Sequence, residues 1–502
     1  MKLRKKLLFQ LLLLIVMGAS QAQDYIEVYK KNVLHKFVRF DKETDKFVTL
    51  VFPSWENETF DVFDQVKDPQ GIAIDLGAWI GTTAIWLAKN FKHVIAVEAD
   101  KISLKALKMN LKASGCPNVS ICKKPVAQTS ENVIFGPRGN ELNESVSYIK
   151  PVSDTQHDYV VRGITFKQLM YDYVYRKNAL KSSKISFIKC DIEGGEENII
   201  EDILYFAYYN KVKVYLSFHL SWWKSKKITD VEYLFKFFKT NCPSSNISGY
   251  LQKYPFASLL FEPIDSDEVL IKKNIPAIII GYNQVTYIRN MVKQLERYTS
   301  DIVIIDNNSS FKPLLDYYEK EFNYTLLKQK ANYGHVVYNK KSVQKLVGAV
   351  HIMTDPDLKF NSHLPNNFLQ TLIEISYYYK AQRVGFALQI DAPDIRNDLF
   401  HGPHTIQAWE RQFWRNRLQY PDPNLELYDA PIDTTFCLVN KKFEPNGTCI
   451  RVAGDFTCKH LPWHTNFRQD FLNGEYETYL KDNITSTWFR IKKNLKLTKN
   501  KC

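Results

Sequence analysis

The sequence predicts two consecutive α/β domains, each with a mostly parallel β-sheet covered by helices. Apolar segments of strand length alternate with helical segments from residue 71 onward, as in sheets whose strands are joined by crossover helices. The alternation pauses in "FEPIDSDEVLIKKN" and restarts at "IPAIIIGYN". A chain of 502 residues is also too long for one ordinary domain. We therefore place the two domains at residues 71–272 and 273–464.

The first residues have the pattern of a secretory signal peptide. The basic stretch "KLRKK" precedes the apolar run "LLFQLLLLIVMG", and Ser20 and Ala22 are small residues suited to cleavage. This run is shorter than the ~20 residues that span a bilayer comfortably, which favours a signal peptide over residues 1–22, with an uncleaved type II anchor as the alternative. We expect a protein of the secretory pathway (ER or Golgi lumen) or a secreted one. The eight cysteines are then expected as a mixture of buried thiols and one or two disulfides.

Residues 23–70 are predicted as a β-rich extension, and the first strand of the sheet follows as "GIAIDLG". The turn after this strand places the bulky Trp79 where a dinucleotide-binding fold needs a glycine beside the pyrophosphate. A cofactor without phosphate, S-adenosylmethionine, fits the turn better. Glu98 ends the next strand, "HVIAVEA", where its carboxylate can accept the ribose hydroxyls.

Several separated motifs resemble the FkbM family of S-adenosylmethionine-dependent O-methyltransferases. They are "WENETFDVFDQ", "AIDLGAWIGTTAIWLA", "HVIAVEAD", "IKCDIEGGEENII" and "VYLSFHLSW", within about residues 50–225. The resemblance implies a Rossmann-like class I methyltransferase fold and methyl transfer to hydroxyls of sugars or polyketides. It implies that the turn at residues 191–194 flanks the transferred methyl group. The cofactor-binding residues that it implies are Asp75, Gly77, Gly81 and Glu98.

Methyl transfer to a hydroxyl requires removal of its proton, by a positioned base or with a metal that lowers the hydroxyl pKa. Asp191 and Glu193 follow one predicted strand and His219 ends the next, which predicts all three at the edge where open α/β sheets bind ligands. His219 is the first candidate for the catalytic base and Asp191 the second; the alternative for His219 is a half-buried histidine at a strand end. Glu196 and Glu197 are predicted as the solvated first turn of a helix.

A pair of carboxylates, Asp355 and Asp357, ends a predicted strand of the second domain in "GAVHIMTDPDL". Two carboxylates one residue apart, joined by a proline that restricts the loop, suit a hard divalent cation and a ribose or diphosphate. Enzymes that use nucleotide sugars need such a cation, Mn²⁺ or Mg²⁺, because the departing nucleoside diphosphate is charged.

The order of these motifs resembles the GT-A type of glycosyltransferase, especially its family-two-like group, over about residues 273–464. The resemblance implies a nucleotide sugar as the donor. It implies that Tyr282 and Asn283 close the first strand against the nucleotide and that Asp306 contacts its base or ribose.

The same resemblance implies which residues bind the metal and which lie near the acceptor. Asp355 and Asp357 hold the metal and the diphosphate, and Asp433 is a candidate base near the acceptor. His460 or His464 can complete the metal shell, with a packed turn as the alternative for "HLPWH".

These patterns predict a bifunctional glycan-modifying enzyme that O-methylates a sugar hydroxyl and transfers a sugar from a nucleotide donor. In the alternative, the second domain is a non-catalytic carbohydrate-binding or structural module. The expected partner is a glycan or sugar acceptor. The net charge of +13 is partly carried by a predicted basic tail, residues 465–502, which suits peripheral contact with anionic lipid. A nucleic-acid methyltransferase would need a cytosolic or nuclear location, and the secretory leader argues against it.

Overall fold

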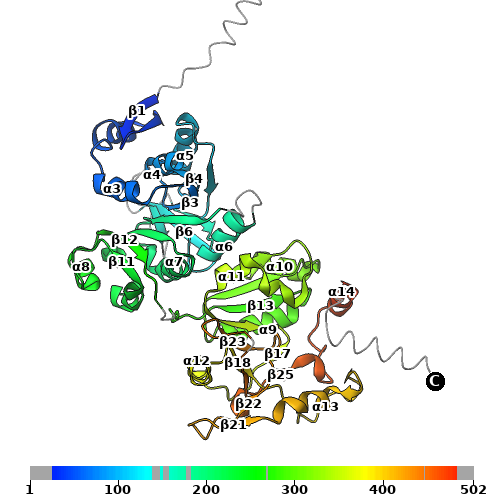
Figure 1. Ribbon diagram of the computed structural model, residues 1–502. Coiled ribbons are helices and arrows are strands. Elements are labelled where there is room, and N and C mark those ends of the chain that lie inside the picture. The colour runs from blue at the N-terminus through cyan, green and yellow to red at the C-terminus, as the bar shows by residue number, and fades with distance from the viewer. Residues whose placement is uncertain are drawn as a thin grey trace, which may run out of the picture.

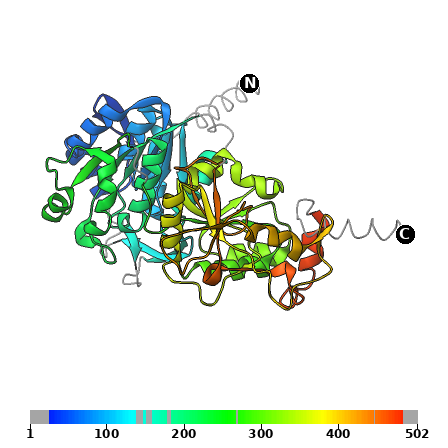
Figure 2. The ribbon, with the colours of Figure 1, turned by 60° about the horizontal axis from the view of Figure 1, so that its bottom comes forward.

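The structure is a computed structural model that describes residues 25–137, 147–150, 158–176, 183–266, 270–445 and 447–482. The blue-to-green part of the chain forms one α/β domain and the green-to-red part a second (Figure 1, and turned in Figure 2). The predicted signal peptide, residues 1–22, and residues 483–502 of the predicted tail lie outside the described residues. In the described part of the chain, no helix has both the length and the apolar character needed to cross a bilayer.

A seven-stranded sheet forms the centre of the first domain. In spatial order its strands are β11 (Phe238–Thr240), β12 (Ser258–Pro263), β10 (Lys213–Ser217), β9 (Ile185–Cys190), β3 (Asp68–Leu76), β4 (Phe91–Val97) and β5 (Val119–Cys122). All run parallel except β12, which is antiparallel to β10 and β11. The chain moves outward from β3 to β5 and then returns to place β9 beside β3. The predicted Rossmann-like α/β sheet is confirmed, with its topological switch point between β3 and β9.

Helices cover both faces of this sheet. They are α3 (Asn57–Val66), α4 (Thr82–Asn90), α5 (Lys101–Ala113), α6 (Phe166–Met170), α7 (Glu196–Asn210) and α8 (Ile247–Lys253), with the shorter turns η2 (Tyr171–Tyr175), η4 (Leu220–Trp222), η5 (Ile228–Asp230) and η6 (Glu232–Phe237). Alternate residues of β3 enter two separate cores. Ile72 and Ile74 pack in the cluster that contains Ile203 of α7, and Ala73 packs in the cluster that contains Trp86 of α4.

The N-terminal extension is an integral layer of the first domain. Strands β1 (Tyr25–Lys30) and β2 (Val33–Val38) pair as an antiparallel hairpin, and α2 (Lys42–Lys46), η1 (Phe47–Val51) and α3 follow. Only its start is therefore β-structured. Phe60 and Phe63 of α3 lie 6.3 and 5.7 Å from the Trp86 ring, measured between centroids. The extension thus closes one face of the sheet with aromatic contacts.

A small antiparallel sheet is inserted between β5 and α6. It consists of β7 (Ser147–Lys150), β6 (Asn132–Pro137) and β8 (Tyr159–Arg162), with β6 in the middle. Tyr159 donates a hydrogen bond from its hydroxyl to the carbonyl oxygen of Ala99, just after β4, at 2.6 Å. This bond ties the inserted sheet to the carboxyl edge of the main sheet.

The second domain has a nine-stranded sheet. In spatial order its strands are β15 (Thr325–Lys328), β14 (Ile302–Asp306), β13 (Ala277–Gly281), β16 (Val350–Thr354), β23 (Cys437–Asn440), β18 (Arg383–Phe386), β24 (Cys449–Val452), β22 (Leu427–Asp429) and β21 (Arg417–Leu418). The first four run parallel, and β23 is antiparallel to both of its neighbours. Two short pairs, β17 (Leu358–Lys359) with β25 (Lys459–His460) and β19 (Phe400–His401) with β20 (His404–Thr405), lie outside this sheet. This domain is thus also α/β.

The helices of the second domain follow its strands. They are α9 (Val285–Leu295), α10 (Lys312–Lys320), α11 (Lys341–Val347), α12 (Phe368–Tyr379), α13 (Ile406–Glu410) and α14 (Glu475–Asp482), with the turns η7 (Gly334–Asn339), η8 (Arg411–Trp414), η9 (Gly454–Phe456) and η10 (Leu461–Trp463). Helix α14 corrects the prediction of a basic tail from residue 465. Its Glu475 is fully buried, and Tyr479 packs against Tyr282 beyond β13.

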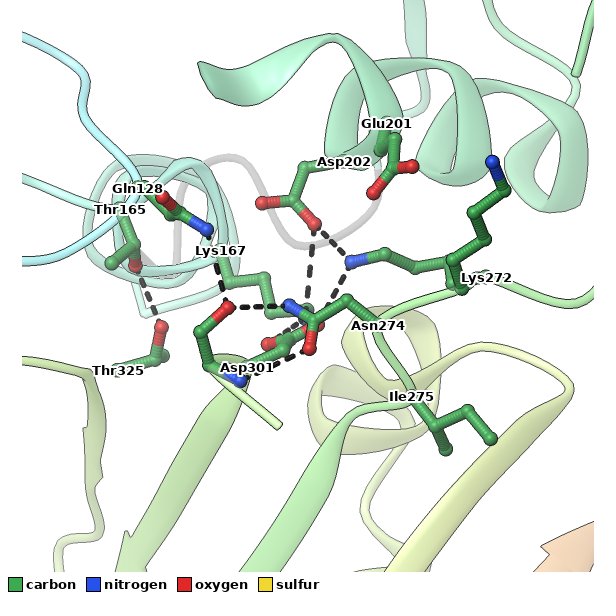
Figure 3. A network of polar contacts seen from close by, with 12 residues as sticks. Gln128, Thr165, Lys167, Glu201, Asp202, Lys272, Asn274, Ile275, Asp301 and Thr325 are labelled. Carbon is green, nitrogen blue, oxygen red and sulfur yellow. Dashed lines mark hydrogen bonds and ion pairs between the residues drawn. The ribbon is translucent and has the colours of Figure 1, made fainter. Parts of the chain in front are cut away.

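The two domains share one hydrophobic core and a buried ionic contact. A single cluster of apolar residues contains members of α6 and α7 from the first domain and of β13, β14 and α11 from the second. Beside it lie four charged residues that we call the interface ion cluster, namely Lys167, Asp202, Lys272 and Asp301 (Figure 3). Lys167 contacts Asp301, and Lys272 contacts both Asp202 and Asp301.

The described cysteines are all free thiols, and Cys502 lies outside the described residues. The expected disulfides are therefore not formed there. Cys437 on β23 and Cys449 on β24 are separated by the whole of β18, and strands spaced about 4.8 Å apart leave two such cysteines beyond the reach of a disulfide.

Candidate functional site

The turn between β3 and α4 is built on two glycines. Gly77 has φ +82°, and a Cβ on it would meet the carbonyl oxygen of Asp191 at 1.8 Å. Gly81 has φ +99° and immediately precedes α4, where a Cβ would lie 3.1 Å from Leu107. The turn is therefore pressed against the end of β9, with no room for a side chain at Gly77. This contact brings the ends of β3 and β9 to one edge.

Glu98, just after β4, faces the same edge. Its two carboxylate oxygens accept hydrogen bonds from the N–H groups of Trp79, at 2.8 Å, and Asp100, at 2.7 Å. Burial raises the pKa of Glu98 to about 7. A carboxylate has about four lone-pair sites, so two remain for ligand hydroxyls.

Asp75, predicted to bind the cofactor, lies beneath the turn and does not line the cavity. Its Oδ2 accepts a hydrogen bond from the Thr83 hydroxyl at 2.7 Å, and its Oδ1 lies 3.3 Å from Lys189 Nζ. Lys189 in turn donates to the carbonyl oxygen of Gly77 at 2.7 Å and does line the cavity. Asp75 therefore acts through Lys189, which fixes the turn to β9.

A cavity of about 300 Å³ opens at the switch point. Its lining combines the turn residues Gly77 and Trp79 with Glu98, and on the opposite side Asp191, Glu193 and His219. Phe135 and Tyr148 of the inserted sheet and Glu56 before α3 complete it. With Asp100, five lining side chains are carboxylates and two, Lys189 and His219, are basic, so acidic groups predominate and the cavity suits a cationic ligand.

His219, after β10, is held by a carboxylate behind it. Its Nδ1 lies 3.0 Å from Glu196 Oε1, and Glu196 also accepts hydrogen bonds from the N–H groups of Ile192 and Gly194, each at 2.9 Å. The imidazole stacks on Trp222, with centroids 4.9 Å apart and planes at 4°. The other nitrogen, Nε2, faces the cavity.

Two carboxylates face Nε2 of His219 across the cavity wall. Asp191 Oδ1 lies 3.6 Å away and Glu193 Oε2 lies 3.4 Å away. Burial opposes protonation, but the Glu196 hydrogen bond and these carboxylates outweigh it and raise the pKa of His219 to about 9. Burial and Asp191 raise the pKa of Glu193 to about 7. His219 is thus an imidazolium at neutral pH, which leaves Asp191 and Glu193 as the groups able to accept a proton.

The first turn of α7 differs from the prediction of a solvated acidic turn. Glu196 is 1% exposed and Glu197 is 8% exposed. Glu197 accepts hydrogen bonds from the N–H groups of Lys224 and Ser225 at 2.8 and 3.0 Å. These acids are buried because their carboxylates bind residues of the loop after β10. Those partners lie more than twenty positions away in the sequence, so the local pattern does not show them. Lys189 was also missed, although a lysine inside the apolar run "ISFIKC" was a signal.

In the carboxylate pair of the second domain, Asp357 is buried and Asp355 is half-buried. Asp355 Oδ2 accepts a hydrogen bond from the Thr434 hydroxyl at 2.8 Å, and burial together with Asp357 raises the pKa of Asp355 well above its usual range. Burial raises the pKa of Asp357 to about 7. Asp433, the candidate base, is exposed one residue before Thr434. The strand end thus brings three carboxylates into one region.

The pairing of β17 with β25 brings one of the two candidate histidines to Asp357. His460 Nε2 lies 3.6 Å from Asp357 Oδ2, whereas His464 Nδ1 lies 2.9 Å from an oxygen of Asp394. The buried atoms Asp357 Oδ1 and His460 Nδ1 have no hydrogen-bond partner. His460 is therefore the histidine placed to share a ligand with Asp357.

The residues predicted to hold the nucleotide are buried in the structure. Asn283 Oδ1 accepts hydrogen bonds from the N–H groups of Ser310 and Phe311 at 2.8 and 2.9 Å. Asp306 accepts one from the Ser309 N–H at 3.1 Å, and it is 2% exposed. Tyr282 is 9% exposed under α14. These side chains shape the loops after β13 and β14.

No protein-family model and no curated protein matches this sequence. Solved structures that are similar include an rRNA methylase from Streptococcus thermophilus (13% identity, 42% of this chain and 96% of that chain, TM-score 0.25). Others are methyltransferase FkbM from Methylobacillus flagellatus KT (14%, 43% and 52%, 0.24) and TYW2 from M. jannaschii in complex with AdoMet (11%, 48% and 87%, 0.24). At these identities and TM-scores, the fold of the first domain rests on its own strand order.

Proposed function

We propose that the first domain is an S-adenosylmethionine-dependent O-methyltransferase that acts on a hydroxyl group of a sugar or glycan. One observation carries the proposal: the cavity at the switch point of a Rossmann-like sheet is lined by five carboxylates and by a turn that places Trp79 where a pyrophosphate would need a glycine. S-adenosylmethionine, when bound, supplies a methyl group on a positively charged sulfonium. An acidic cavity favours such a cation and disfavours the pyrophosphate of a dinucleotide.

The residues of the cavity divide into a binding end and a reacting end. At the binding end, Glu98 keeps two lone-pair sites for ribose hydroxyls, while Trp79 occupies the place of a pyrophosphate-binding glycine. At the reacting end, the acceptor hydroxyl loses its proton as its oxygen bonds to the methyl carbon and the carbon–sulfur bond breaks. Asp191 or Glu193 accepts that proton at a carboxylate oxygen.

The test of this proposal is cofactor binding followed by turnover. Calorimetry on the full-length protein is expected to show binding of S-adenosylmethionine and of its demethylated product, and none of NAD. Incubation with methyl-labelled cofactor and a panel of sugars is then expected to label a sugar hydroxyl. Binding of NAD without any binding of S-adenosylmethionine would contradict the proposal.

For the second domain we propose metal-dependent glycosyl transfer from a nucleotide sugar. The supporting observation is the pair of buried atoms without hydrogen-bond partners, Asp357 Oδ1 and His460 Nδ1, beside a second carboxylate. Leaving such atoms unsatisfied costs about 1–3 kcal/mol each, and a bound Mn²⁺ or Mg²⁺ would give Asp357 a partner. We propose that both activities act on one glycan in the secretory lumen, and the signal-peptide pattern of residues 1–22 supports this.

The second proposal is tested with the double substitution Asp355→Asn and Asp357→Asn. The unmodified protein is expected to release nucleoside diphosphate from one member of a panel of nucleotide sugars in the presence of Mn²⁺, and the double variant is expected to release none. Equal release by both proteins would contradict the role of the two carboxylates, and no release and no Mn²⁺-dependent binding by either would instead identify a non-catalytic module.

A further inference from the structure

We propose that the first domain holds a divalent cation of the Mn²⁺ or Zn²⁺ class at Asp191, Glu193 and His219. Asp191, Glu196 and His219 form, within the described ranges, the one group of three potential ligand residues whose ligand atoms all lie within 4.8 Å of one another. Asp191 and His219 of this group line the acidic cavity together with Glu193, and Glu196 lies behind the histidine. The group is separate from the Asp355–Asp357 pair, to which the sequence assigns the metal.

The distances from His219 Nε2 to the two carboxylates fit atoms that bind one cation better than atoms that share a hydrogen bond. The distances of 3.4 and 3.6 Å from Nε2 to Glu193 and Asp191 exceed those of good hydrogen bonds. Metal–nitrogen and metal–oxygen bonds of about 2.1 Å in a tetrahedral site separate neighbouring ligand atoms by about 3.4 Å. Nε2 of His219 is thus spaced from each of the two carboxylates as neighbouring ligand atoms of one cation are, and all three residues line the cavity.

Glu196 has the place of an orienting residue behind a metal-bound histidine. Histidines that bind metals almost always give their second ring N–H to a carboxylate or carbonyl, which fixes the free nitrogen toward the metal. Glu196 accepts that bond from Nδ1 at 3.0 Å and is itself held by two backbone N–H groups. Its oxygens are thereby occupied, so Glu193 supplies the third ligand. Stacking on Trp222 fixes the ring plane.

The ligand set selects the kind of cation. The cation takes the place of the proton on His219 Nε2, which is released on binding. One imidazole and two carboxylates then suit borderline cations such as Mn²⁺ and Zn²⁺ better than Ca²⁺, which takes oxygen ligands. The role of the cation rests on the proposed function: a bound cation would make the acceptor hydroxyl easier to deprotonate, and the proton would go to the oxygen of Asp191 or Glu193 that does not bind the cation. Cation binding itself does not depend on methyl transfer.

The experiment uses the full-length protein carrying Asp355→Asn and Asp357→Asn, so that the second domain contributes no competing site. Calorimetry with Mn²⁺ and with Zn²⁺ is expected to show one equivalent bound. Adding Glu193→Gln or Asp191→Asn is expected to weaken binding at least tenfold, and Glu196→Gln by about 10–100-fold through the orientation of the histidine. Circular dichroism checks that each variant is folded.

The identity of the nitrogen ligand is read by pulsed electron paramagnetic resonance of bound Mn²⁺. A ¹⁴N coupling is expected, and it should disappear in His219→Ala but persist in the control His460→Ala. Absence of binding in the double-variant background, or equal affinity before and after Glu193→Gln, would overturn the site. Binding of S-adenosylmethionine is measured in parallel, so that a failed cofactor site and a failed cation site are distinguished.

Discussion

Glu98 illustrates how one side chain both shapes a site and serves it. Its carboxylate accepts two backbone N–H groups, from Trp79 and Asp100, and faces the cavity with its remaining lone pairs. An amide at this position could not accept both bonds, because its –NH₂ group only donates. Glu98→Gln is therefore expected to weaken binding of S-adenosylmethionine at least tenfold in calorimetry. Asp64→Asn, which affects an exposed pair with Lys67, is the control and should bind as the unmodified protein does.

Gly77 permits a prediction about the steric cost of adding a side chain to the turn. An alanine there meets two penalties, a positive φ that costs about 1–2 kcal/mol and a clash with the Asp191 carbonyl oxygen at 1.8 Å. Gly402 has φ +60°, and a Cβ added there would have nothing within 4 Å, so Gly402→Ala isolates the first penalty. Gly77→Ala should lower the free energy of unfolding in urea by clearly more than Gly402→Ala. Equal losses would show that the turn can move away from β9.

The sequence could predict those residues whose signal is local. Gly77 and Glu98 were predicted because a strand, a turn and a strand-end acid are contiguous patterns. Glu196 was assigned to solvent because its partner His219 lies 23 positions away, and only the folded β9–β10 pair brings them together. Trp222 and Glu56 enter the cavity region through loops whose course no periodicity encodes.

At the scale of elements, strands were easier to predict than the segments that cover them. The central strands are short runs of almost uninterrupted apolar residues, a pattern that buried parallel strands impose. Helix α14 escaped prediction because it is anchored by one buried acid and by the packing of Tyr479 on the distant Tyr282. Glu475 accepts hydrogen bonds from the N–H and hydroxyl of Thr286, at 2.8 and 2.7 Å, and so caps the start of α9 from a distant part of the chain.

This anchoring gives a prediction for α14. Glu475→Ala leaves the half-buried Thr286 N–H without its acceptor, which costs up to about 1–3 kcal/mol. Hydrogen exchange followed by mass spectrometry is expected to show faster exchange in α14 and in the first turn of α9. Glu477 lies on the exposed side of the same helix, so Glu477→Ala should leave exchange unchanged. Faster exchange in both variants would point to helix propensity instead of the Thr286 contact.

At the scale of the whole molecule, the domains are joined more firmly than a boundary in the sequence suggests. The hydroxyls of Thr165 and Thr325 are hydrogen-bonded across the interface at 2.6 Å, and Arg162 donates to the carbonyl oxygen of Phe322 at 3.1 Å. The shared apolar core adds to these bonds. Alternating strands and helices predict each sheet, but contacts between residues about 160 positions apart leave no periodic trace. The sequence therefore could not predict how the two domains pack against each other, and only the structure shows it.

The interface ion cluster supplies the last prediction. Lys167 and Lys272 share two carboxylate partners in Figure 3, Asp202 and Asp301. Although burial opposes ionisation, the two lysines lower the pKa of Asp301 to about 2. Asp301→Asn leaves two buried ammonium groups short of a counter-charge, a loss of about 3–5 kcal/mol, and both domains are expected to unfold at lower urea in one transition. The exposed Asp265→Asn is the control.

The pH dependence of that loss follows from the sign of the shift. Because the folded pKa of Asp301 lies below the ordinary aspartate value of about 3.9, its contribution is complete above about pH 4 and is lost as the pH falls toward 2. The difference in unfolding free energy between the unmodified protein and Asp301→Asn should therefore be constant from pH 7 to about 5 and shrink between 4 and 2. A difference that is already shrinking at pH 6 would mean that another group holds the two domains together.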